Sequence, residues 1–156
     1  MATLNKFNAF LEDFAEKVHN MGSDAHKFLL TNTVPNAADV TVDTVTGTCT
    51  VEATSNAPEI AAGSGYTKGG IAPTITSSAQ SGGVYKLVLA DATWTASGGT
   101  IGPFRYIVWY NDTGGAAATR PAVGWYDYGS AITLNDGETF TLDFDPTNGV
   151  LQGTLT

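Results

Sequence analysis

Apolar and polar residues follow two different periods along this chain. In residues 1–22 apolar side chains recur at spacings of three and four, the stripe of an amphipathic helix. The stripe consists of Leu4, Phe7, Leu11, Phe14, Ala15 and Val18, and Phe10 widens it. Gly22 follows as a typical helix-ending residue. The pattern therefore predicts an N-terminal amphipathic helix or arm over residues 1–22.

From Lys27 onward apolar residues alternate with a period of two, which is typical of β-strands. The alternating segments are residues 27–31, 40–42, 49–53, 84–89, 104–110, 125–128, 131–134, 139–144 and 150–155. Segment 104–110 is apolar on both faces, which predicts a central strand. Thr46-Gly47 and Asn135-Asp136-Gly137 predict turns, the second of them a hairpin between its neighbouring strands. Residues 59–70 predict a flexible, glycine-rich surface loop.

Seven to nine short strands with turn signals at this spacing predict a mainly β fold. We expect an antiparallel β-sandwich, jelly-roll-like, over residues 23–156, preceded by the helical segment 1–22. The length of 156 residues suits one domain with one continuous core.

The amino-acid composition argues against two classes of partner, nucleic acids and membranes. Charged residues make up 14% of the chain, and the formal net charge is −8. This acidic balance argues against a nucleic-acid partner, which needs clustered Lys and Arg. No apolar run approaches the roughly 20 residues of a membrane span, so no membrane partner is expected. The first residues lack the basic and apolar regions of a signal peptide, which predicts assembly in a cytoplasm.

Candidate catalytic and metal-binding groups are few. Cys49 is the only cysteine, and its alternation with threonines predicts a buried side chain. Lys68 is followed by two glycines, so the glycine-rich loop lacks the order of a phosphate-binding loop. A nucleophilic Ser64 would have to recruit His19 or His26. We expect no catalytic residues and no cofactor.

Acidic and aromatic residues leave further interpretations open. Asp143, Asp145 and Asn148 could bind calcium, although Asp-Pro followed by Asn-Gly is itself a turn signal; the turn is favoured, and no metal is expected. Glycoside hydrolysis would need paired carboxylates from the glutamates outside the N-terminal segment: Glu52, Glu59 and Glu138. The tryptophans could stack on sugars, but core packing is favoured. They are Trp94, Trp109 and Trp125.

Several stretches that together span most of the chain resemble a family of small structural proteins of tailed bacteriophages. They are KFNAF (6–10), VHN (18–20), LTNTVP (30–35), EIAAGSGYT (59–67), YKLVLAD (85–91), IGPFRY (101–106) and GWYDYGS (124–130). The nearest role within that resemblance is a capsid decoration, or cement, protein. It implies a non-enzymatic homo-oligomer on the exterior of the virion capsid, assembled in the host cytoplasm. Its partner would be the major capsid protein, whose neighbouring subunits it would bridge.

The apolar N-terminal segment is the natural clamp in this hypothesis, with Phe7, Phe10, Leu11 and Phe14 as partner-contact residues. Each buried phenylalanine would contribute about 2 kcal/mol before ordering costs. Deleting residues 1–22 should then abolish shell binding and leave the β domain folded. The alternative is that the segment covers one end of its own sandwich.

Two other functions stay open. The chain could be a tail-tip or fibre domain that binds a receptor or glycan in a shallow groove formed by Trp109, Trp125 or Tyr110. It could also be a β-sandwich enzyme acting on polysaccharide, with two convergent carboxylates about 5–9 Å apart.

Overall fold

A computed structural model describes residues 3–45 and 49–154. The chain is mainly β with antiparallel sheets and almost no helix. The largest sheet has the order β2 (His26–Thr31), β9 (Ile101–Asn111), β10 (Arg120–Leu134), β3 (Thr41–Asp43), β4 (Thr50–Glu52) and β5 (Ala57–Pro58), and β1 (Asn5–Lys6) also pairs with β10. The one helix among the described residues is α1 (Phe10–Ala15).

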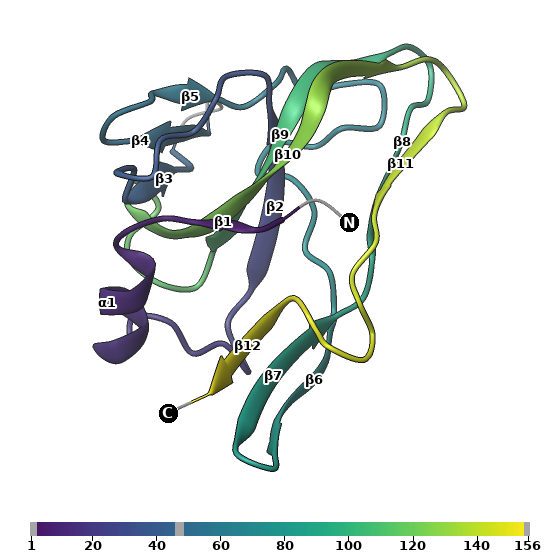
Figure 1. The fold of residues 1–156 in the computed structure, drawn as a ribbon. Coiled ribbons are helices and arrows are strands. Elements are labelled where there is room, and N and C mark those ends of the chain that lie inside the picture. The colour runs from purple at the N-terminus through teal and green to yellow at the C-terminus, as the bar shows by residue number, and fades with distance from the viewer. Residues whose placement is uncertain (1–2, 46–48, 155–156) are drawn as a thin grey trace.

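Two smaller sheets lie beside the large one (Figure 1). One pairs β11 (Thr139–Leu142) with β8 (Ala92–Thr95), and the other has the order β12 (Leu151–Thr154), β7 (Val84–Leu89), β6 (Ile75–Ser81). The predicted mainly β, antiparallel character is confirmed, while the jelly-roll connectivity stays a prediction.

The large sheet is apolar on both faces. One cluster, which includes Phe28, Trp109 and Phe144, also takes in side chains from the two smaller sheets. A second cluster on the opposite face contains Leu29, Val108 and others. Successive strand residues point to opposite faces, so β2 and β9 supply both clusters. Strand β9 pairs with β2 on one side and β10 on the other, which confirms its predicted central position.

The helix predicted over residues 1–22 is confined to six residues, Phe10–Ala15. Before it, β1 pairs with β10 through Asn5 and Lys6, and the Phe7 amide donates to the Val123 carbonyl at 3.2 Å. After it, Lys17 adopts a φ of +64°, which a continuing helix cannot contain. Pairing to β10 therefore replaced the predicted helical hydrogen bonds before α1, and the left-handed residue Lys17 ended the helix after it.

The predicted hairpin at residues 135–137 is wrong in its pairing. The turn forms, because the Glu138 amide donates to the Asn135 carbonyl at 2.9 Å, but β11 pairs with β8 rather than β10. Ala96, just after β8, accepts from the Gly137 amide and donates to the Glu138 carbonyl, which draws the turn away from β10.

Two further strand predictions differ from the structure. Segments 125–128 and 131–134 belong to one strand, β10, and β6 was missed because its residues do not alternate. Strands β3 and β4 form within two of the predicted segments and pair antiparallel, whereas the predicted turn at Thr46-Gly47 lies outside the described residues.

Candidate functional site

The four predicted partner-contact residues separate into a buried pair and an exposed pair. Phe7 is 2% and Phe10 is 6% exposed, whereas Leu11 is 73% and Phe14 is 45% exposed. Phe7 packs on Trp125 with ring centroids 4.7 Å apart, so it has no surface to offer a partner, which corrects its assignment. The described part of this segment, from residue 3 to 22, thus packs on the β domain through Phe7 and Phe10, while Leu11 and Phe14 are its exposed large apolar side chains.

A groove lies beside this exposed pair. It has a volume of about 140 Å³, and we call it the α1 groove; its lining residues are Lys6, Phe10, Leu11, Phe14, Tyr85, Leu151, Gln152 and Gly153. Strand β12 forms one wall and pairs with β7 alone among the described strands, so its outer edge has free backbone groups. The one charged residue in the groove lining is Lys6, whereas Glu12 and Glu16 line a separate pocket. Apolar side chains with polar residues at their margin are typical of a protein-binding surface.

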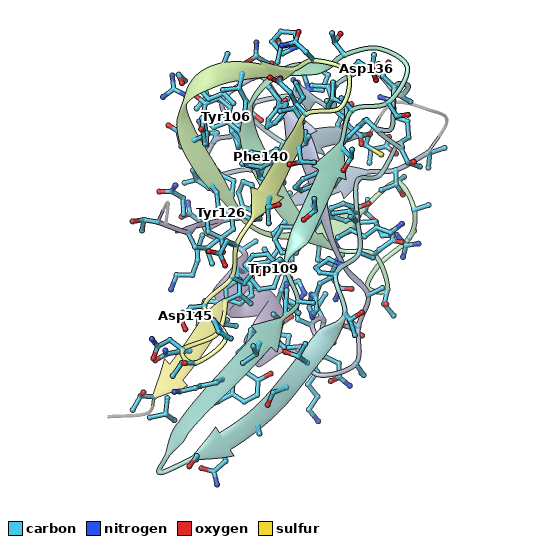
Figure 2. The ribbon with its side chains drawn as sticks, turned by 90° about the vertical axis from the view of Figure 1, so that its right-hand side faces the viewer. Tyr106, Trp109, Tyr126, Asp136, Phe140 and Asp145 are labelled. Atoms are coloured by element: carbon cyan, nitrogen blue, oxygen red, sulfur yellow. The ribbon has the colours of Figure 1, made fainter. Side chains whose placement is uncertain are left out.

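The expected groove of Trp109, Trp125 and Tyr110 does not form. Trp109 and Tyr110 are completely buried, and Trp94 is 3% exposed. Figure 2 places Trp109 near the middle of the molecule. The core interpretation of Trp94 and Trp109 is confirmed, and Trp125 is half-buried against Phe7.

A different aromatic cavity was missed at the sequence level. This aromatic pocket, of about 190 Å³, is lined by Ile107, Tyr126, Tyr128, Phe140, Thr141, Leu142 and Asp143. The alternation of Tyr126 and Tyr128 opposite Trp125 indicated one shared face, but only the tertiary structure brings Phe140 of β11 against it.

Both histidines are buried in a hydrogen-bonded cluster rather than poised beside a nucleophile. Trp109 donates to His26 Nδ1 at 3.2 Å, so His26 Nε2 carries the proton and donates to the Met21 carbonyl at 2.9 Å. Asn111 lies 3.2 Å from His19 Nδ1. His19 Nε2 is 3.9 Å from Asp13 Oδ2. These contacts hold the histidines as neutral structural groups.

Acid should therefore destabilise the fold. Burial lowers the pKa of His19 to about 4 and also lowers that of His26. Below about pH 6.5 the unfolded chain binds protons at these sites while the folded chain does not, so the free energy of unfolding falls as pH falls from about 6.5 to about 4. His19 alone accounts for about 3 kcal/mol. Urea denaturation at about pH 7 and about pH 4.5 measures this loss.

The variant His19→Gln is the control for that measurement, because carboxylates also titrate in acid. Its stability should fall less steeply over the same range than that of the unmodified chain. Parallel pH profiles for the two proteins would contradict the assignment of His19.

The glycine-rich loop is held in place, which corrects its prediction as flexible. Tyr66 donates to Glu59 Oε1 at 2.6 Å and accepts from the Leu30 amide at 2.9 Å. The Gly69 amide donates to the same carboxylate oxygen at 2.8 Å. Lys68 Nζ lies 3.7 Å from Glu59 Oε2. Glu59 is 6% exposed, and the role of its carboxylate in this structure is to anchor the glycine-rich loop.

Cys49 belongs to the same region. It is 4% exposed, and burial with the neighbouring Glu59 raises the pKa of its thiol to about 12. The prediction of a buried cysteine is confirmed.

Removing one hydroxyl tests the anchor. Tyr66→Phe removes one of the two hydrogen-bond donors of Glu59 Oε1, the other being the Gly69 amide, and leaves the buried Leu30 amide without its side-chain acceptor. We therefore expect a loss of about 2 kcal/mol in unfolding free energy. Thermal and urea denaturation measure the loss. Tyr128→Phe, which alters an exposed hydroxyl, should change stability little; equal losses in both variants would contradict the anchoring role.

Residues 143–148 form the predicted turn. Asp145 Oδ1 accepts the amides of Thr147 and Asn148, each at 2.8 Å, and these bonds lower the pKa of Asp145. Across 3–45 and 49–154, no three His, Cys, Asp or Glu side chains are grouped to hold a metal. No helix in those ranges is long and apolar enough to cross a membrane.

Comparison of the chain with protein-family models, with curated proteins and with solved structures finds no match.

Proposed function

We propose that this chain is a structural protein of a tailed-phage virion that decorates the outside of the capsid and bridges major capsid subunits. Two things support the proposal: the sequence resemblance to phage structural proteins, and the exposed apolar pair Leu11 and Phe14 beside the α1 groove. The exposed pair is the observation that carries it, because a side chain such as Leu11, 73% exposed, gains most from burial in a partner.

In this mechanism Leu11 and Phe14 insert between residues of the coat subunit. An extended coat segment pairs with the free edge of β12 and directs alternate side chains into the α1 groove. The net charge of −8 favours a basic coat surface, so binding should weaken as salt rises.

Modest contacts suffice for such a protein. Burial of Leu11 and Phe14 is worth about 2 kcal/mol each before ordering costs. A homo-oligomer in which every copy contacts a coat subunit multiplies this affinity, since each further contact is made at a high effective concentration. The jelly-roll-like sandwich is part of the same proposal.

Location on the particle tests the proposal. Virions that encode the chain are purified, heads are separated from tails on a gradient, and the chain is quantified in each fraction against the major capsid protein. Copies in proportion to the capsid protein on heads are the expected result. A few copies confined to tails would overturn decoration in favour of a receptor-binding tail domain, and absence from both would reject any structural role.

A further inference from the structure

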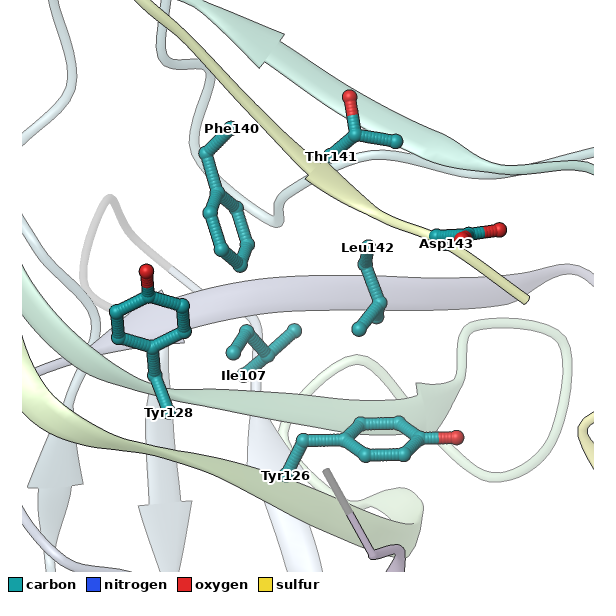
Figure 3. A pocket seen from close by; sticks show the side chains of 7 residues that line it. All are labelled: Ile107, Tyr126, Tyr128, Phe140, Thr141, Leu142 and Asp143. Atoms are coloured by element: carbon teal, nitrogen blue, oxygen red, sulfur yellow. The ribbon is translucent and has the colours of Figure 1, made fainter. Parts of the chain in front are cut away.

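The aromatic pocket and the α1 groove are formed by different secondary-structure elements. Its walls come from β9, β10 and β11, and from Asp143 just after β11. Figure 3 shows the rings of Tyr126, Tyr128 and Phe140 around the opening, with Asp143 at one end. The rings of Tyr128 and Phe140 meet edge to face, with centroids 5.7 Å apart and planes at 83°. Tyr128 is 51% exposed, so its ring is accessible to a ligand.

An ion pair positions Tyr128. Arg105 of β9 donates to both oxygens of Asp127, at 2.7 Å and 2.8 Å, and Asp127 Oδ1 also accepts from the Gly129 amide at 2.8 Å. The pairing register between β9 and β10 shifts directly after Asp127. The carboxylate therefore clamps the residues on either side of Tyr128 where the strand leaves its regular course.

The side chain of Tyr126 lines the pocket, and no hydrogen bond joins its hydroxyl to the residues in 3–45 and 49–154. Tyr126 is 3% exposed, and its hydroxyl lies at the Asp143 end of the pocket in Figure 3. Because this hydroxyl makes no hydrogen bond to the described residues, it is free to bond a ligand hydroxyl in the pocket. Burial raises its pKa, which keeps it protonated and able both to donate and to accept.

Asp143 adds an acceptor at the same end. It is exposed and forms no ion pair with the described residues. A carboxylate accepts from two neighbouring hydroxyls at once, and aromatic faces carry negative charge that attracts the C–H bonds of a sugar ring. A space of about 190 Å³ takes one such ring, since drug-sized ligands need roughly 300–1,000 Å³.

From these contacts we propose that the aromatic pocket binds a neutral hexopyranose, such as the terminal sugar of a surface glycan. The sugar ring packs on Tyr128 and Phe140, and its hydroxyls hydrogen-bond Tyr126 and Asp143. Anionic sugars are excluded because Asp143 and the net charge of −8 repel them.

The test uses the full chain, isotopically labelled for NMR, and titrates it separately with glucose, galactose, mannose and N-acetylglucosamine. The expected result is saturable shifts confined to residues around the pocket for at least one sugar. Tyr128→Ala should weaken binding by more than about tenfold, because the exposed ring supplies the packing surface. Tyr126→Phe and Asp143→Asn should each weaken it by about tenfold. Phe14→Ala in the α1 groove is the matched aromatic control and should leave sugar binding unchanged.

Three outcomes would overturn the proposal. The first is the absence of saturable shifts with all four sugars. The second is binding that survives Tyr128→Ala, provided that spectra away from the pocket show the variant to be folded. The third is that Tyr128→Ala loses binding to phage heads although the unmodified chain binds none of the sugars. That result would make the pocket a contact site for another protein. Loss of head binding in Phe14→Ala concerns only the decoration proposal, so the two proposals fail separately.

Discussion

Replacing Phe7 by alanine is expected to lower the free energy of unfolding by about 3–5 kcal/mol. The side chain is 2% exposed and sits with Leu29, Val42 and Val108 in the second core cluster. Its removal takes away the packing against Trp125 and leaves a cavity that the rigid β10 strand cannot close. Urea denaturation followed by circular dichroism measures the loss.

Leu11→Ala is the control for Phe7→Ala. Leu11 belongs to the same apolar stripe but is 73% exposed, so its truncation should change stability by less than about 0.5 kcal/mol. Similar losses in the two variants would show that the N-terminal segment is not packed as described.

The burial of Phe7 also changes the result that we expect when residues 1–22 are deleted. Deleting residues 1–22 would remove β1 from the edge of β10 and take Phe7, Phe10 and Met21 out of the core. The shortened chain should therefore lose cooperative folding, which corrects the prediction that the β domain folds without this segment. Point substitutions at exposed positions are the proper test of partner contact.

The double substitution Leu11→Ser with Phe14→Ser is expected to reduce binding to phage heads by roughly 10³-fold. Each apolar side chain, if buried at the centre of a contact, is worth about 2 kcal/mol, and about 1.4 kcal/mol corresponds to a factor of ten. Both side chains are exposed, so folding should survive. Co-sedimentation of the variant with heads measures binding, and circular dichroism verifies the fold.

The matched control replaces two exposed apolar residues elsewhere, Val34→Ser with Val40→Ser. These side chains are 58% and 41% exposed and lie outside the α1 groove. The control should bind heads like the unmodified chain. Unchanged binding in the Leu11 and Phe14 variant, or an equal loss in the control, would reject the α1 groove as the docking surface.

The candidate site was only partly predictable. The pattern correctly marked the N-terminal segment as apolar, but a helical stripe does not say which of its residues face the chain's own core. Pairing of β1 with β10 buries Phe7, and the short helix α1 exposes Leu11 and Phe14. The aromatic pocket could not be predicted, because Tyr126 and Phe140 come from different sheets and β11 is drawn to β8 by Ala96.

The sequence by itself determined the strand-rich class, the central position of β9, the buried cysteine and the turn at Asp145. Each follows from a local pattern, namely period-two alternation, apolar character on both faces, or a side chain that bonds its own backbone. The tertiary structure alone decided the partner of β11, the anchoring of the glycine-rich loop by Glu59, and the division of the N-terminal stripe between core and surface. These features depend on hydrogen bonds and packing between residues far apart in the chain, and local periodicity contains no information about such contacts.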